Sequence, residues 1–149
     1  MSKLSVPIPP DEAQRLFLLR ASHLLESSHT DPSFDRFCTL AKRLFNVPFV
    51  LINLIDVERA FVKSTAGVPT MQEFPRDTSF CSYTIFPDFP EVFVVEDSHL
   101  DDRFKNYFCV VNPPHVRFYA GAALILNNVR VGSLCIHGLE PRDFSTEEV

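Results

Sequence analysis

The chain has 149 residues, of which 46% are hydrophobic and 22% are charged, a balance typical of one folded domain and not of a disordered segment. Its 14 basic and 19 acidic residues give a net charge of −5, and without a run of Lys or Arg we expect no nucleic-acid partner. No stretch has the ~18–20 consecutive apolar residues that cross a bilayer, and the N-terminus lacks a signal-peptide pattern, so we expect a cytoplasmic protein without a membrane partner.

The first expected element is a helix within residues 1–28 that follows a Pro-rich lead-in and begins near Asp11. Leu16, Leu19 and His23 lie on roughly the opposite side of this helix from its main apolar face, and apolar residues on two sides require a second contact surface. Either loops of the same domain cover these residues, or they form the interface of a homodimer. The main face repeats at helical spacing through Phe17, Leu18, Ala21, Leu24 and Leu25.

A second helix is expected to start at Asp31 and Pro32, because Asp caps free N–H groups and Pro at the first helical position loses no hydrogen bond. It ends at Asn46, before Pro48. Cys38 lies within its apolar stripe and is most simply a small core residue. The stripe consists of Phe34, Phe37, Cys38, Ala41, Leu44 and Phe45.

From Pro48 the pattern changes to that of strands. Residues 49–55 and 60–64 predict one hairpin, and residues 116–126 and 129–137 predict another, joined by two Asn residues that tolerate positive φ. A further strand is expected at 91–95. Gly121 and Gly132 lie within strands, where glycine indicates a bulge or a close approach of the backbone.

The remaining segments predict long loops. Residues 65–79 form one loop, residues 80–86 are expected to contain a short helix, and residues 96–115 are expected to be a functional, partly structured loop. A capping box from Ser145 to Glu148 predicts that a last helix starts within 145–149. The order of elements predicts a single α+β domain with its core at 31–138, in which a central antiparallel sheet carries helices on one face and pocket loops on the other.

Alternation along the strands gathers a few polar side chains, among them Asn53, Tyr119 and Cys135, on faces that carry mostly apolar residues. If these faces coincide, they line the kind of cavity that binds small molecules. Alternatively, Asn53 and Tyr119 only satisfy backbone groups of the loops. Arg117, like Arg76, either pairs with a carboxylate or phosphate of a ligand or anchors a loop to an acid, for which Asp97, Asp101 and Asp102 are the candidates.

We expect neither a catalytic residue nor a metal site. The four cysteines, which include Cys81 and Cys135, are far apart and form no C-x-x-C pair. A Cys–His nucleophile would require a histidine from a remote segment. Cys135 and His137 offer two metal ligands on one face, without a third.

Several motifs follow one another from about residue 11 to the end of the chain, and together they resemble a GAF domain of the type found in sensor histidine kinases and cyclic-dinucleotide signalling proteins. Their order supports the resemblance over nearly the whole chain. They are the segment 34–48, the strand pair ending at 54–56 and 61–64, Pro75-Arg-Asp-Thr-Ser-Phe-Cys81, Asp102-Arg-Phe104, Pro113-Pro-His-Val-Arg-Phe-Tyr-Ala-Gly-Ala122 and Gly132-Ser-Leu-Cys135.

The resemblance implies a PAS-like sheet, a pocket for a small-molecule ligand, dimerisation through the terminal helices and no enzymatic activity in the domain itself. It also implies a role in signal transduction, such as a two-component system, with an output kinase or cyclase domain C-terminal to this one. Ligand contacts are then expected at Asn53, Phe80, Cys81, Tyr83, Asp97, Arg117, Tyr119 and Cys135.

The ligand and any cofactor stay unassigned, because no bilin-attachment motif and no cyclic-nucleotide set is present. The subtype usually ends its last strand as Cys-Val-Ile-Asp, whereas this chain has Cys135-Ile-His-Gly138. Three alternatives stay open. They are a ligand-free dimerisation scaffold, a thiol redox sensor that uses Cys81 and Cys135, and an enzyme similar to free-methionine sulfoxide reductases, whose clustered catalytic cysteines this chain lacks.

Overall fold

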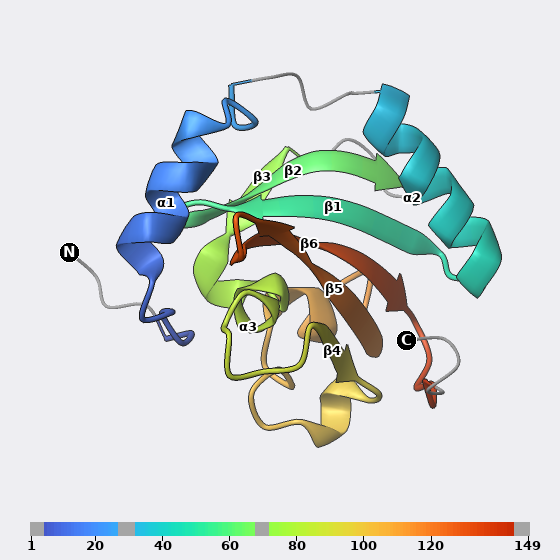
Figure 1. Ribbon diagram of the computed structural model, residues 1–149. Helices are drawn as coiled ribbons and strands as arrows, with labels where there is room; N and C mark the ends of the chain where they lie inside the picture. Colours follow the sequence, from blue (N-terminus) through green and yellow to red (C-terminus); the bar gives the residue numbers. More distant parts are fainter. Residues whose placement is uncertain (1–4, 27–31, 68–71, 145–149) are drawn as a thin grey trace.

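The computed structural model describes residues 5–26, 32–67 and 72–144, and it is built on one six-stranded sheet (Figure 1). The strands follow the order β3-β2-β1-β6-β5-β4, and each neighbouring pair is antiparallel. This confirms the predicted central antiparallel sheet. The strands are β1 (Phe49–Ile55), β2 (Arg59–Ala66), β3 (Glu73–Pro75), β4 (Val92–Val95), β5 (Phe118–Leu126) and β6 (Val129–Gly138).

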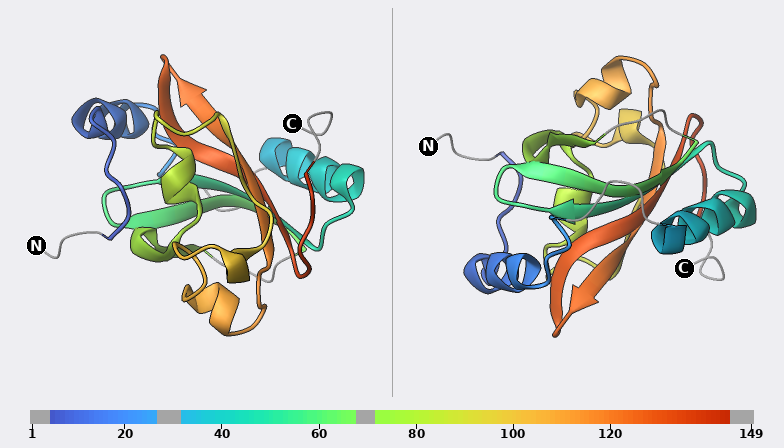
Figure 2. Two further views of the ribbon diagram at one scale, coloured as in Figure 1. Left: turned by 90° about the horizontal axis from the view of Figure 1, so that it is seen from below. Right: turned by 90° about the horizontal axis from the view of Figure 1, so that it is seen from above.

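Two layers cover the two faces of the sheet (Figure 1). The longer helices α1 (Glu12–Ala21) and α2 (Pro32–Phe45) lie on one face. The other face carries the short helices α3 (Cys81–Thr84) and α4 (Phe108–Val111), with the 3-10 turns η1 (Arg76–Thr78) and η2 (Ser98–Leu100) and their loops. Figure 2 shows α3 lying across the strands. The predicted α+β arrangement is therefore confirmed.

The predicted hairpins and their turn are confirmed. Asn127 and Asn128 have φ of 49° and 66°, the left-handed values that a two-residue turn between twisted strands requires. The loop predicted at 65–79 is wrong in one respect, because β3 (Glu73–Pro75) pairs with β2 at the edge of the sheet. A three-residue strand that includes Pro leaves little periodic signal, and an edge is where sheets accept Pro.

Helix α1 is rotated relative to the prediction. Leu19 is fully buried among Leu54, Phe61 and Val131 of the sheet, whereas Phe17 is 70% exposed. Leu19 therefore belongs to the core of this chain, and its assignment to a dimer interface is wrong. The helix also ends at Ala21, and His23 beyond it has a left-handed backbone and an exposed side chain. The buried Arg15 explains the rotation, because the helix turns toward the sheet the side that carries this ion-pairing residue.

Helix α2 confirms half of its predicted stripe. Cys38 and Ala41 are buried against the sheet, and Phe34 and Phe45 pack beside them. Phe37 and Leu44 are 61% and 72% exposed, so their place in the core was predicted wrongly. Residues 34, 38, 41 and 45 form one straight row on a helix of 3.6 residues per turn, and residues 37 and 44 form the neighbouring row.

The chain leaves the sheet beside the C-terminal end of α2. The ring of Phe144 lies 5.8 Å from that of Phe45, and Arg142 Nη1 donates to the Phe45 carbonyl at 2.6 Å. The predicted cap at Asp31 and the predicted helix start at 145–149 lie outside the described residues. Within the described part of the chain, no helix is long and apolar enough to cross a membrane.

Candidate functional site

The polar faces of three strands coincide beneath α3. Strand β6 lies between β1 and β5, and its Ser133 pairs with Asn53 while its Cys135 pairs with both Leu51 and Gly121. Residues opposite one another in neighbouring strands project to the same face. The face that alternation predicted for Asn53, Tyr119 and Cys135 is therefore one surface, and α3 covers it.

Two thiols meet at the centre of this surface. The Sγ atoms of Cys81, the first residue of α3, and of Cys135 on β6 are 3.6 Å apart. Ser133 Oγ donates to Cys81 Sγ at 2.9 Å, Asn53 Nδ2 donates at 3.2 Å, and Tyr119 Oη donates at 3.4 Å. Each of these side chains is 0–1% exposed. We call Asn53, Cys81, Tyr119, Ser133 and Cys135 the thiol centre.

Tyr119 is fixed in the thiol centre by small neighbours. Its hydroxyl lies 2.9 Å from Thr84 Oγ1, and a Cβ added at Gly121 would approach that hydroxyl to 2.1 Å. Gly121 therefore provides the space that the phenol occupies, which confirms the close approach predicted at this position. Gly132 meets the same need toward the backbone of Asn53, where an added Cβ would lie 2.0 Å from the carbonyl oxygen.

The hydrogen bonds give the two thiols different acidities. Burial alone would raise the pKa of Cys81, but hydrogen bonds from Cys135, Ser133, Tyr119 and Asn53 together lower it to about 6. Burial raises the pKa of Cys135 well above its usual value, and the neighbouring Cys81 raises it further. One negative charge therefore resides on Cys81, while Cys135 keeps its proton and directs it to acceptors such as the Leu51 carbonyl at 3.4 Å.

Two polar atoms at this surface have no hydrogen-bond partner among the described residues. They are Asn53 Oδ1 and Nδ1 of His137, which follows Cys135 on the same face of β6. His137 packs edge-on against Tyr119, with ring centroids 5.2 Å apart, and burial lowers its pKa to about 4. Most buried polar atoms are paired, so these two are vacant positions for an additional hydrogen-bonding group.

Aromatic rings fill the space above the thiol centre. Phe80 stacks on Tyr119 with ring centroids 5.0 Å apart and lies 4.7 Å from the ring of Phe104. Arg103 covers the outer side of this layer, with its guanidinium 5.0 Å from the Phe104 ring and 5.4 Å from that of Tyr83. The loops thus close over the sheet by packing of rings.

Six of the eight predicted ligand-contact residues lie in or on this centre. The other two, Asp97 and Arg117, pair with each other through two hydrogen bonds of 3.0 Å, and Arg117 lowers the pKa of Asp97. This pair anchors η2 to the start of β5, which is the loop-anchoring alternative. The six residues are Asn53, Phe80, Cys81, Tyr83, Tyr119 and Cys135.

Two arginines attach the α3 segment to the rest of the fold. Arg76 in η1 is 1% exposed and binds Glu12 of α1 at 2.6 Å, together with two carbonyl oxygens of the β1–β2 turn. Arg130 of β6 donates to the carbonyls of Thr84, Phe86 and Phe89 at the other end of the segment. Arg76 therefore anchors a loop, as its alternative reading holds, although its partner is Glu12 and not one of the predicted acids.

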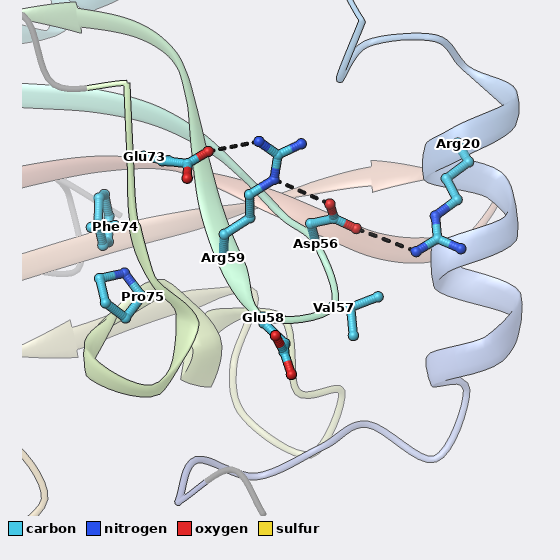
Figure 3. A pocket seen from close by; sticks show the side chains of 8 residues that line it. All are labelled: Arg20, Asp56, Val57, Glu58, Arg59, Glu73, Phe74 and Pro75. Atoms are coloured by element: carbon cyan, nitrogen blue, oxygen red, sulfur yellow. Dashed lines mark hydrogen bonds and ion pairs between the residues drawn. The ribbon is translucent and has the colours of Figure 1, made fainter. Parts of the chain in front are cut away.

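A hollow of about 590 Å³ lies at the surface between α1 and the β1–β2 turn (Figure 3). Its charged side chains bind one another: Arg59 contacts Asp56 at 3.2 Å and Glu73 at 2.6 Å, and Arg20 lies 3.7 Å from Asp56. Because these charges already neutralise one another, this hollow offers a ligand less than the thiol centre does.

The described residues contain no group of three or more potential metal ligands. All four cysteines are free thiols in the structure. The chemistry of the site therefore rests on two thiols, their hydrogen-bond donors and the surrounding rings.

A family model of the GAF domain matches residues 29–149. The chain belongs to the GAF domain family. It is also 36% identical over 137 residues to a cyclic di-GMP phosphodiesterase of Pseudomonas aeruginosa. The match covers 91% of this chain but only 23% of that protein, so the chain spans less than a quarter of the relative's length.

Solved structures show the same fold at low sequence identity. The GAF domain of an Acinetobacter phosphoenolpyruvate-protein phosphotransferase is 17% identical with a TM-score of 0.62, covering 91% of this chain and 83% of that one. A type II free methionine-R-sulfoxide reductase from Thermoplasma acidophilum is 14% identical with a TM-score of 0.63, covering 78% of this chain and 79% of that one. The expected resemblance to GAF domains of signalling proteins is therefore confirmed.

Sequence reasoning missed several parts of the site as ligand contacts. Ser133 was recognisable, because it lies two residues before Cys135 on the same strand face. Thr84 lies three residues after Cys81, and the expected helix places both on one side. Arg130 had no such signal, since its carbonyl partners lie more than forty residues away along the chain.

Proposed function

We propose that this GAF domain is a regulatory sensor of a small molecule and has no catalytic activity of its own. The observation that carries the proposal is the fully buried thiol centre, with unpartnered polar atoms on Asn53 and His137 beside it. Burial of unpaired polar groups costs free energy. A ligand that places a hydrogen-bond donor against Asn53 Oδ1 offsets this cost.

The ligand site we propose lies between α3 and the sheet. Aromatic walls with a few placed polar groups are typical of small-molecule sites, and this centre has both. Because Phe80 packs against Tyr119 at this place, a ligand must displace rings as it binds. Binding and movement of the α3 segment are then the same event.

The output we propose runs from α3 to α1. The Ser82 hydroxyl donates to the carbonyl of Arg76 at 2.6 Å, and the Arg76 side chain binds Glu12. A shift of α3 therefore pulls on the first turn of α1. For this shift to regulate an attached enzyme, the ligand must bind the two positions of α3 with different affinity.

The protein that contains this domain is, we propose, an enzyme of cyclic-dinucleotide signalling. This rests on the relative, which is named a cyclic di-GMP phosphodiesterase. Such an output domain takes the place of the kinase or cyclase domain that the resemblance alone suggested. In this proposal the domain controls the enzyme and takes no part in its reaction.

The ligand site is tested with four classes of probe: cyclic dinucleotides, mononucleotides, amino acids and tetrapyrroles. We expect one class to raise the melting temperature of the domain and to shift the NMR signals of Tyr119 and His137. The variant Asn53→Leu should abolish both effects, whereas Arg20→Gln in the surface hollow should leave them unchanged. If no class acts, or if the shifted signals surround Arg59 and Glu73, the proposal is wrong.

A homodimer through the outer side of α1 is a second candidate. Phe17 is 70% exposed, and it borders a surface groove with Ala13, Leu16 and Ala21. Leu16 thus keeps the interface role that Leu19 has lost. Contiguous exposed apolar surface often marks an interaction site.

A further inference from the structure

The two thiols beneath α3 carry an inference that needs no ligand and does not depend on the proposed function. We propose that Cys81 and Cys135 form a peroxide-reactive pair that closes to a disulfide between α3 and β6. Their Sγ atoms are 3.6 Å apart, and a disulfide requires about 2.05 Å. A shift of less than 2 Å in a helix of one turn therefore brings them to bonding distance.

Cys81 is the attacking residue. Four potential donors converge on its sulfur, from Asn53, Tyr119, Ser133 and Cys135. Donors arranged in this way stabilise an anion, and the thiolate is the nucleophilic form of cysteine. Cys135 instead directs its own proton to acceptors, so it is the resolving residue.

The reaction consumes one hydroperoxide. The Cys81 thiolate attacks the terminal oxygen and breaks the O–O bond, so that sulfur is oxidised to sulfenic acid and the second oxygen leaves as hydroxide or alkoxide, which takes a proton from solvent. Cys135 then loses its proton and attacks Cys81 Sγ. The sulfenic hydroxyl departs with that proton as water, and the S–S bond forms.

The packing around the pair selects small oxidants. Cys81 is 1% exposed and Cys135 is 0% exposed, under the stacked rings of Phe80 and Tyr119. A reagent must pass through a local opening of α3, which is a short element of the kind that opens at low cost. Hydrogen peroxide is therefore expected to react faster than a bulky aryl-alkyl hydroperoxide.

Closure of the disulfide removes the charge that orders the centre. The donors on Asn53 and Ser133 lose their thiolate acceptor, and α3 becomes tied to β6. Because Arg76 joins this segment to Glu12, oxidation reports to α1 through the same ion pair. The pair is thus a redox input to the domain.

The other two cysteines provide matched controls. Cys38 packs between α2 and the sheet, in the cluster on the opposite face. Cys109 in α4 lies on the same side as α3, but burial raises its pKa to about 11. Neither has the converging donors of Cys81, so neither should react.

The test is hydrogen peroxide treatment of the wild-type protein, followed by alkylation and non-reducing peptide mapping. We expect a peptide pair joined through Cys81 and Cys135, with the loss of two hydrogens, that a dithiol reductant separates. Absence of this pair, or a bond that involves Cys38 or Cys109, overturns the proposal. The mapping needs no variant, so it holds even if a substituted protein fails to fold.

Variants then separate the roles of the two thiols. In Cys135→Ser, dimedone should trap a sulfenic acid on Cys81, because the resolving thiol is absent. Ser133→Ala removes the shortest donor and should slow this trapping about tenfold at neutral pH, whereas Cys109→Ser should leave the rate unchanged. An unchanged rate in Ser133→Ala contradicts the assignment of the donors. Ligand binding is measured on reduced protein, so the two proposals fail independently.

Discussion

The guanidinium of Arg76 lies 2.6 Å from the carboxylate of Glu12, although 64 residues separate the two along the chain. Arg15 binds the same carboxylate at 2.8 Å from within α1. Burial would raise the pKa of Glu12, but hydrogen bonds from Arg15 and Arg76 lower it to about 2. This pair fastens the first helix to the segment that carries Cys81, and it is the contact through which the two parts of the domain influence each other.

Arg76→Gln should therefore lower the free energy of unfolding by about 3 kcal/mol, because it leaves a partly buried carboxylate short of one cation. Urea denaturation measures this loss. In a double-mutant cycle with Glu12→Gln, the two losses should be less than additive, since each removes the same contact. Arg59→Gln is the matched control, because its pair with Glu73 is exposed and should cost less than about 1 kcal/mol. Equal losses for the two arginines would contradict this role of Arg76.

The buried His137 should make stability fall in mild acid. Its pKa is lowered from 6.5 to about 4 by burial, so between these values the unfolded chain binds a proton that the folded chain does not. Stability therefore rises with pH across this window and is lost as the pH falls from 6.5 toward 4. We expect a loss of about 1–3 kcal/mol.

His137→Gln tests this assignment, because it keeps a polar side chain of similar size that does not titrate. Urea midpoints measured at several pH values should lose their slope between pH 6.5 and 4 in this variant. His23→Gln serves as the control, since that imidazole is exposed. A slope that survives in His137→Gln would show that another group titrates in this range.

The sequence predicted the sheet and the coincidence of its polar faces, because both follow from the period of two along strands. Asn53, Tyr119 and Cys135 were found in this way. The rotation of α1 was not predictable from apolar spacing, since the charged Arg15 lies inward with Leu19 and the apolar Phe17 lies outward. An inward arginine requires a partner, and Arg15 finds one in the Ile55 carbonyl, which only the tertiary structure brings near.

The outer side of α1 and its inner side should respond differently to substitution. Leu19→Ala creates a cavity in the core and should cost about 2–4 kcal/mol. Phe17→Glu should leave stability nearly unchanged but, if α1 forms a homodimer, it should halve the mass measured by sedimentation. Thr39→Glu on the exposed surface of α2 is the control for added charge. A monomeric wild-type protein, or a dimer that survives Phe17→Glu, would rule out this interface.

Gly121→Ala should disturb the thiol centre without touching a thiol. The new Cβ would lie 2.1 Å from the Tyr119 hydroxyl and 3.1 Å from Thr84 Oγ1. Tyr119 is fully buried and stacked on Phe80, so it has no free direction in which to retreat. We expect a loss of at least about 2 kcal/mol in urea denaturation, in the range that overpacked cores show.

Two further variants establish that Tyr119 is the cause. In a Tyr119→Leu background the ring and its hydroxyl are absent, so Gly121→Ala should cost markedly less than in the wild type. Gly138→Ala is the matched control, because its Cβ would meet Phe118 Cβ at 3.3 Å, a contact that a small adjustment relieves. If Gly121→Ala is as well tolerated as Gly138→Ala, then the phenol has room to move, and its hydrogen bond to Cys81 cannot depend on the glycine.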